Sequence, residues 1–173
     1  TMDLLGSGDA EEVARRKTAS YTTVGPLAAG AALAGANDEQ VERLAGIARP
    51  IGVAFQLRDD ILGAFGAPSV TGKPVGTDLR TGKRTFLILE ALERAEPESR
   101  ALIESVLGDE HAPDETVAEA CGLIEQCGAR AACERRIDEL VGAAQQNIAA
   151  EPYLPAGKAL LEHVTKLVGR RIV

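Results

Sequence analysis

Two adjacent carboxylates, Asp59 and Asp60, lie in a largely apolar segment and could together hold a metal ion. The segment reads Phe55-Gln56-Leu57-Arg58-Asp59-Asp60-Ile61-Leu62-Gly63. On a helix, residues three and four apart share a face, so Gln56, Asp59 and Gly63 point the same way. Oxygen ligands without His or Cys suit Mg²⁺, which keeps several waters and bridges to substrate phosphates. An Asp-Asp pair alone is more often simply solvated, so its surroundings must support the metal-site hypothesis.

A basic, glycine-rich segment follows these carboxylates directly. It runs from Gly66 to Arg84, which is about 19 residues, and loops of that length in compact domains are more often functional than not. Between Pro68 and Arg84 it carries four basic residues and one acidic residue, in a chain of net charge −7. Glycines allow close approach of a ligand and lysines act as mobile charges for phosphate. A phosphate-binding loop and a solvated surface loop are both consistent with this composition.

A third cluster, Arg15-Arg16-Lys17-Thr18-Ala19-Ser20-Tyr21, lies near the N-terminus. Lys17 and Tyr21 are four apart and would share a helix face. Small residues follow, including Gly25, Ala28 and Gly30, and would let another helix pack closely. The alternative is an ordinary amphipathic helix with a basic turn.

Helices must position these clusters. Aromatic residues make up 3% of the chain and no strand alternation is convincing, so we predict an all-α protein. Apolar spacing and capping residues predict helices over 9–35, 38–65, 85–95, 98–107, 114–127, 129–150 and 156–170, with Pro50 kinking the second.

Charge and composition exclude several classes of function. The excess of 26 Asp+Glu over 19 Lys+Arg argues against nucleic-acid binding. The weakly polar stretch from Val24 to Ala36 is shorter than the roughly 20 residues of a membrane span, so we expect no integral membrane segment and a close-packed helix there. Three cysteines are too few for a disulfide framework, which favours a cytoplasmic location. Their spacing also favours ordinary thiols over a zinc site.

The three clusters together resemble the trans-isoprenyl diphosphate synthases, in particular the actinobacterial geranylgeranyl and polyprenyl type. The matching segments are Lys17 to Tyr21, Gly52 to Leu62 and Val70 to Thr85. The resemblance implies a helical bundle of the isoprenoid synthase type. It also implies Mg²⁺-assisted ionisation of an allylic diphosphate, attack by isopentenyl diphosphate and loss of a proton. The product would be a longer all-trans prenyl diphosphate, such as farnesyl or geranylgeranyl diphosphate.

The resemblance also implies a role for each motif residue. Asp59 and Asp60 correspond to metal-binding carboxylates of the second aspartate-rich motif. The expected catalytic residues are Lys17, Thr18 and Gln56, and the expected diphosphate-binding residues are Lys17, Lys73 and Lys83. Asp78 would orient the loop or bind an outer-shell water, and Tyr21 would lie near the cavity.

The sequence departs from this family in two ways. The third carboxylate of the second motif is replaced by Gly63, and a first aspartate-rich motif is absent from these 173 residues. We therefore expect residues 1–173 to be the C-terminal portion of a single isoprenoid synthase domain, inactive in elongation when alone. With the other half absent, Val24 to Leu33 would be uncovered, so we also expect a homo-oligomer.

Two other functions are consistent with parts of the pattern. The chain could be a noncatalytic half-synthase that binds and tunes a full-length synthase, although a pure scaffold has no chemical need for Lys17, Gln56 or Asp59. A class I terpene cyclase would use similar metals. Those enzymes usually carry mixed Asn, Ser and Glu ligands in the second motif, which Asp59-Asp60 does not match.

Overall fold

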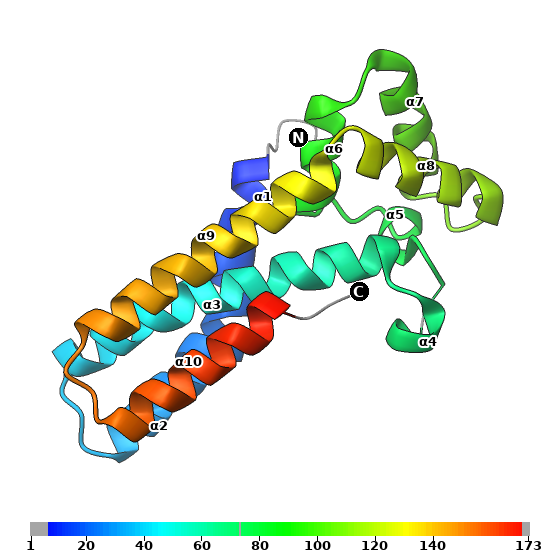
Figure 1. The fold of residues 1–173 in the computed structure, drawn as a ribbon. Helices are drawn as coiled ribbons and strands as arrows, with labels where there is room; N and C mark the ends of the chain where they lie inside the picture. The colour runs from blue at the N-terminus through cyan, green and yellow to red at the C-terminus, as the bar shows by residue number, and fades with distance from the viewer. Residues whose placement is uncertain (1–6, 73, 171–173) are drawn as a thin grey trace. The chain divides into compact units, whose positions relative to one another are not determined.

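The computed structural model describes residues 7–72 and 74–170, and this part of the chain contains helices and no strand. The elements, in order, are α1 (Ser7–Ala14), η1 (Arg15–Val24), α2 (Gly25–Leu33), α3 (Asp38–Phe65), α4 (Pro68–Thr71), α5 (Thr77–Arg80), α6 (Phe86–Arg94), α7 (Pro97–Val106), α8 (Asp114–Gln126), α9 (Ala129–Ala150) and α10 (Pro155–Arg170) (Figure 1). The all-α prediction is confirmed, and α3 continues through Pro50. No described helix is both long enough and apolar enough to cross a membrane.

Two elements differ from the sequence-based prediction. The glycine-rich segment is not wholly irregular, because α4 and α5 form within it; Pro68 begins α4, and the left-handed Gly72 ends it. The predicted helix over 9–35 is divided, since η1 is a π-helix of 10 residues between two α-helices. π-helices are rare and usually one turn long, and they occur frequently at functional sites.

The π-helix changes which side chains share a face. The Gly25 amide donates to the Ser20 carbonyl, a bond that reaches five residues back. Residues five apart, such as Thr18 and Thr23, therefore lie on the same side, and both hydrogen-bond to α3. Lys17 and Tyr21 are four apart and both exposed, and their shared face stays a prediction.

The chain divides into two compact units, each described by itself. Of the described residues, unit A contains Ser7–Ala10 and Leu57–Arg135, and unit B contains Glu11–Gln56 and Arg136–Arg170. Both α3 and α9 contribute to each unit.

Unit A is built around α6. Seven of its nine residues are buried, from Phe86 to Leu92, and α7 packs against both α6 and α8 (Figure 1). The Thr85 side chain caps α6 by accepting a hydrogen bond from the Ile88 amide at 3.3 Å. Burying nearly a whole helix removes a large apolar area from water, which makes α6 the centre of this unit's core.

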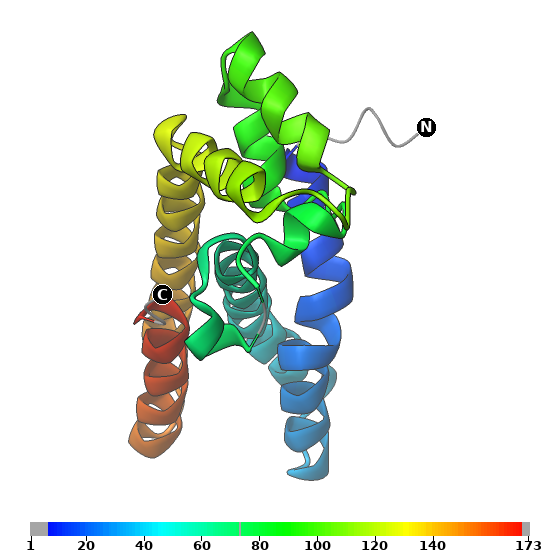
Figure 2. The ribbon, with the colours of Figure 1, turned by 90° about the vertical axis from the view of Figure 1, so that its right-hand side faces the viewer.

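Unit B is a row of packed helices. η1 packs on α3, where Thr23 Oγ1 donates to the Ala48 carbonyl at 3.0 Å. The C-terminal part of α9 joins the other side through Asn147 Nδ2, which donates to the Gly46 carbonyl at 3.3 Å. α10 lies beside α9 (Figure 2), with Lys158 Nζ donating to the Ala149 carbonyl at 3.0 Å.

Candidate functional site

In unit B, a hydrogen bond joins two of the motifs on which the sequence analysis depended. Thr18 Oγ1 donates to Gln56 Oε1 at 2.7 Å, across 38 residues of sequence. The helices can approach this closely because Gly52 faces Ala19: a Cβ on Gly52 would lie 2.6 Å from the Ala19 Cα. Thr18 is buried and Gln56 is half-buried, so the hydrogen bond is partly shielded from water.

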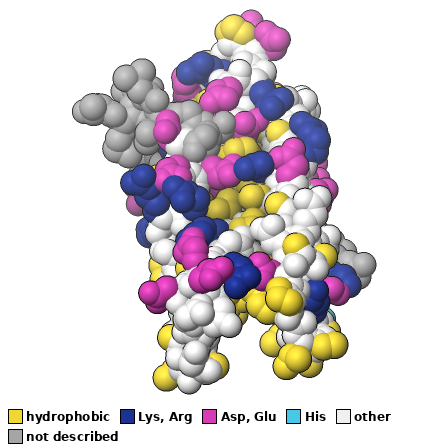
Figure 3. Space-filling view, turned by 90° about the vertical axis from the view of Figure 1, so that its left-hand side faces the viewer, with side chains coloured by type: hydrophobic (Ala, Val, Ile, Leu, Met, Phe, Trp, Pro, Cys, Tyr) yellow, Lys and Arg dark blue, Asp and Glu magenta, His cyan; other side chains and the backbone are white. Residues whose placement is uncertain are grey.

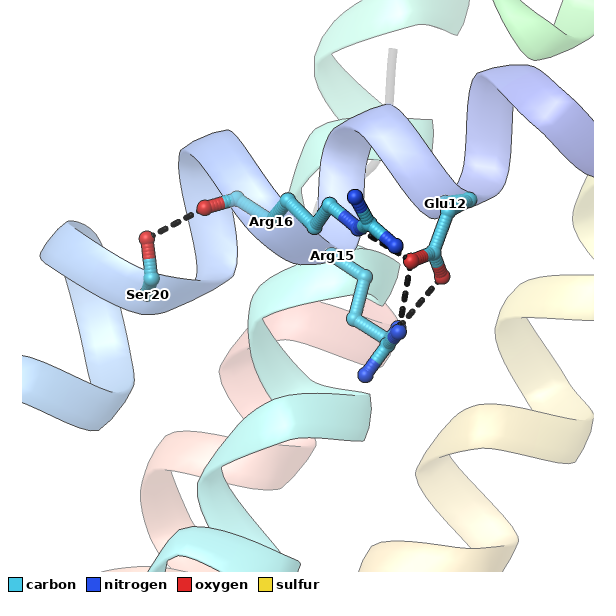
Figure 4. A network of polar contacts seen from close by, with 4 residues as sticks. All are labelled: Glu12, Arg15, Arg16 and Ser20. Atoms are coloured by element: carbon cyan, nitrogen blue, oxygen red, sulfur yellow. Dashed lines mark hydrogen bonds and ion pairs between the residues drawn. The ribbon is translucent and has the colours of Figure 1, made fainter.

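Lys17 lies next to this contact and is exposed. Its two basic neighbours are engaged, since Arg15 forms two hydrogen bonds to the Glu12 carboxylate at 2.6 Å and Arg16 also pairs with it (Figure 4). These hydrogen bonds lower the pKa of Glu12 to about 2, Arg15 contributing most. Within the described residues Lys17 has no such partner, so it is the basic residue of this turn best placed to meet an external anion.

In unit A, the aspartate pair lies on α3. Asp60 is buried with 6% of its surface exposed, Asp59 is half-buried, and Arg58 next to them is buried. Among the described residues, no group of three or more His, Cys, Asp or Glu side chains is arranged to hold a metal ion. The donor set of this segment is two carboxylates, which suits a hard cation that takes its remaining ligands from water or substrate.

The segment after α3 is fixed to unit A at three points. The Gly76 amide donates to the Ala64 carbonyl at 3.2 Å, and Gly76 has a φ of +72°, which favours glycine. Arg80 is held by the Ala112 carbonyl and the Asp114 carboxylate. The Gly108 amide donates to the Leu79 carbonyl at 2.8 Å. α5 is therefore a well-anchored element rather than a freely solvated loop.

Asp78 and Lys83 form an ion pair at the end of α5. The Asp78 side chain is 10% exposed and that of Lys83 is 55% exposed, so a buried carboxylate holds an accessible ammonium group. The sequence alone indicates only a supporting role for Asp78 and does not reveal this pairing. The two residues' spacing of five around Gly82 was the available signal, because a glycine there is typical of a helix C-terminus that folds back.

The structure therefore brings together Thr18 with Gln56, and Asp78 with Lys83. Asp59 and Asp60 are neighbours on α3, and Lys73 lies outside the described residues. Two thiols of unit A are buried and donate to carbonyls of α3, Cys121 to Ala64 and Cys133 to Leu57. Burial raises the pKa of Cys121 to about 11 and raises that of Cys133 further, with a smaller contribution from the Asp60 carboxylate. Such thiols are poor nucleophiles near neutral pH.

The described residues place this chain in the class of all-α proteins, with an aspartate pair on α3 that is followed in the chain by a basic, glycine-bounded turn. Comparison with known proteins identifies the family within this class. A sequence profile of the family described as polyprenyl synthetase matches residues 8–124, and the chain belongs to this family.

Relatives of known activity are prenyl diphosphate synthases. Geranylfarnesyl diphosphate synthase of Aeropyrum pernix is 35% identical over 144 residues, which cover 83% of this chain and 44% of the relative. Nonaprenyl diphosphate synthase of Mycobacterium tuberculosis is 33% identical over 144 residues, covering 82% of this chain and 42% of the relative. The chain thus spans less than half the length of these relatives.

A solved structure shows the same fold at higher coverage. Geranylgeranyl pyrophosphate synthase of Corynebacterium glutamicum, complexed with isoprenyl diphosphate and magnesium, superposes with a TM-score of 0.90 at 36% identity. The superposition covers 96% of this chain and 47% of that structure.

Proposed function

We propose that this chain supplies the C-terminal half of a synthase that joins an allylic diphosphate to isopentenyl diphosphate and releases a longer all-trans prenyl diphosphate, such as farnesyl or geranylgeranyl diphosphate. The observation that carries this proposal is the hydrogen bond from Thr18 to Gln56. Two motifs that are far apart in the sequence, each with a role implied by the resemblance, are in direct contact. Family membership and the relatives' activities support the same reaction.

The roles follow from charge and accessibility. Lys17, exposed beside the Thr18–Gln56 contact, binds the allylic diphosphate, while Thr18 and Gln56 orient polar groups toward the developing allylic cation. Lys83 and Lys73 bind diphosphate oxygens. Groups fixed where charge develops stabilise a transition state most, which suits a leaving group with several negative charges.

Asp59 and Asp60 are the residues that would hold Mg²⁺, because carboxylate oxygens are its preferred protein ligands. Bound Mg²⁺ would neutralise negative charge on the diphosphate leaving group. Two carboxylates form only part of such a site, so we propose that this chain alone binds a diphosphate with Mg²⁺ but does not elongate it. We also propose that residues 1–173 belong to one synthase domain and that the protein is cytoplasmic.

Calorimetric titration of the purified chain with geranyl diphosphate tests this proposal, with and without Mg²⁺. We expect Mg²⁺-dependent binding that is weakened at least about tenfold in Asp59→Asn, since one ligand charge is lost. Asp138→Asn is a matched control, because it changes the same charge at an exposed position of α9. Equal binding by Asp59→Asn and the control would refute the assignment of Asp59.

A prenyl-transfer assay with isopentenyl diphosphate and Mg²⁺ tests the second part. We expect no elongated product from the chain alone, and product formation would contradict that expectation.

A second function, a noncatalytic half-synthase that binds a full-length synthase, is favoured by one observation. None of the nine residues of α2 is buried, although the helix is composed of Gly, Pro, Ala and Leu. Co-expression with a full-length synthase and measurement of its product length would separate the two functions. A stable complex with altered products supports the partner function, and diphosphate binding without any complex supports the first.

A further inference from the structure

We propose that the absence of a side chain at Gly63 leaves the space in which the Asp78 carboxylate lies. In that position Asp78 holds the Lys83 ammonium group where it can bind a diphosphate. The identity of the ligand as a diphosphate rests on the proposed function. The contact of Asp78 with Gly63 and its ion pair with Lys83 do not. Asp78 is a positioning residue in this arrangement, because it acts through Lys83.

The first argument is steric. A Cβ built on Gly63 would overlap the carboxylate of Asp78, meeting Oδ2 and Cγ before any other atom. The Asp78 carboxylate therefore occupies the space that any side chain at position 63 would need. Gly63 is not simply a lost carboxylate, since a carboxyl group from another element, α5, lies against that point of α3.

The second argument is the backbone around the ion pair. The Lys83 amide donates to the Asp78 carbonyl and the Gly82 amide donates to the Leu79 carbonyl, both at 3.0 Å. These two bonds form a Schellman motif at the end of α5, with Gly82 at a φ of +67°. The motif returns the chain over α5, so the Lys83 side chain starts close to the Asp78 carboxylate.

The third argument is the space around Gly82. A Cβ there would lie 3.2 Å from the Gly108 Cα, and the Gly108 amide donates to the Leu79 carbonyl at 2.8 Å. The turn is thus clamped between α3 on one side and the chain after α7 on the other. A buried carboxylate in a fixed turn loses little conformational entropy when it holds an ammonium, which makes this pair more effective than a typical surface pair.

Lysine acylation followed by mass spectrometry tests the ion pair directly. The reagent must reach the Lys83 amine, and the Asp78 carboxylate holds this amine in the ion pair. Lys166 is a matched internal control, because its side chain is also 55% exposed and its carboxylate partner is more distant, at 3.9 Å. We expect Lys83 to react about threefold more slowly than Lys166 in the unmodified chain.

Two variants should remove this protection by different routes. Asp78→Asn removes the charge, and Gly63→Ala displaces the carboxylate, so both should raise the Lys83 rate to about that of Lys166. Gly122→Ala on α8 is the control, because a Cβ there meets nothing within 4 Å. Unchanged Lys83 rates in both variants would overturn the proposal.

A double-mutant cycle keeps the steric part testable if Gly63→Ala folds poorly. We expect Gly63→Ala to lower the thermal midpoint by roughly 3–10 °C, and most of this loss should disappear when Asp78→Ala is present as well. The same loss in both backgrounds would show that Asp78 is not what Gly63 accommodates.

Pyrophosphate separates this proposal from the proposed function. With Mg²⁺ and pyrophosphate, Lys83 should become still less reactive, while Lys166 is unchanged. Absence of this further protection, with the ion-pair results intact, would refute diphosphate binding by Lys83 and leave the Gly63–Asp78 arrangement standing.

Discussion

Two helices of nine residues, α6 and α2, are both strongly apolar and yet differ completely in burial. α6 buries seven residues in unit A, whereas α2 buries none in unit B. Large apolar side chains also lie on the surface elsewhere in unit B, including Leu160 and Leu167 of α10, and apolar groups are visible among the charged ones in Figure 3. Composition alone therefore does not decide burial; a helix is buried only where other elements are present to cover it.

The segment leading to α2 buries a few small residues, Ala14, Thr18 and Ala19, and is held mainly by specific contacts. Glu11 forms two hydrogen bonds with Arg136 of α9, at 2.7 and 2.9 Å. η1 is held by Thr18 and Thr23 and by the close contact with Gly52. α2 follows these anchors and has no core of its own. The difference teaches that α6 is stabilised by apolar area, and the α1–η1–α2 segment by a few specific contacts.

The largest expected effect comes from the buried helix. Leu87→Ala removes a fully buried side chain from α6 and should cost about 2–5 kcal/mol of unfolding free energy, because a cavity remains. Leu33→Ala makes the same chemical change on α2, where the side chain is 91% exposed, and should change stability by less than about 0.5 kcal/mol. Urea denaturation of both variants, at concentrations where the chain is a monomer, measures the difference. Comparable losses in the monomer would contradict this contrast between α6 and α2.

The next effect concerns the close approach of Gly52 on α3 to Ala19 on η1. Gly52→Ala would place a Cβ against Ala19, and we expect a cost of about 1–3 kcal/mol from overpacking. Gly46→Ala, on the same helix, meets nothing within 4 Å and should instead stabilise by about 0.5–1 kcal/mol. If the denaturation midpoints of Gly52→Ala and Gly46→Ala moved in the same direction, the close contact of Gly52 with Ala19 would be contradicted.

Much of the fold was predictable because its boundaries are marked locally. Asp38 begins α3 and Pro155 begins α10, at or next to the predicted helix starts at 38 and 156. The π-helix was not predictable from residue spacing, and its Thr18 and Thr23 side chains hydrogen-bond to a helix far along the chain. Local spacing carries no information about such contacts.

The candidate site divides in the same way. Residue types identified Gln56 and Lys83 as candidates, and the all-α family was recognisable from three ordered motifs. The packing of Asp78 against position 63 was not predictable. A glycine there is expected both where a carboxylate has simply been lost and where another side chain fills the space.

A third prediction concerns the uncovered face of α2, which we expect to drive self-association. Sedimentation velocity at several concentrations should show a homo-oligomer. The combined substitutions Ala29→Glu and Leu33→Glu should raise the dissociation constant at least about tenfold, because burying a charge is costly. Ala101→Glu, at an exposed position of α7, is the control. A monomer at all concentrations, or equal effects of the control, would contradict the prediction.

The smallest expected effect concerns the surface charges near the start of the α1–η1–α2 segment. The pKa of Glu12 is lowered from 4.5 to about 2 by its hydrogen bonds to Arg15 and then Arg16. A carboxyl whose pKa is lower in the folded state stabilises that state above its unfolded pKa. This contribution is therefore present above about pH 4.5 and lost as the pH falls toward 2.

Carbon-detected NMR of the Glu12 carboxyl measures this directly. We expect its midpoint near pH 2 in the unmodified chain and a clear upward shift in Arg15→Met, with a smaller shift in Arg16→Met, because Arg15 is the larger cause. Salt should weaken the effect, since the group is fully exposed and its interactions are screened. An unshifted midpoint in Arg15→Met would show that these ion pairs do not persist in solution. Because the Glu12 pairs lie within the α1–η1–α2 segment, its contacts with α3 and α9 through Thr18, Thr23 and Glu11 would remain its anchors.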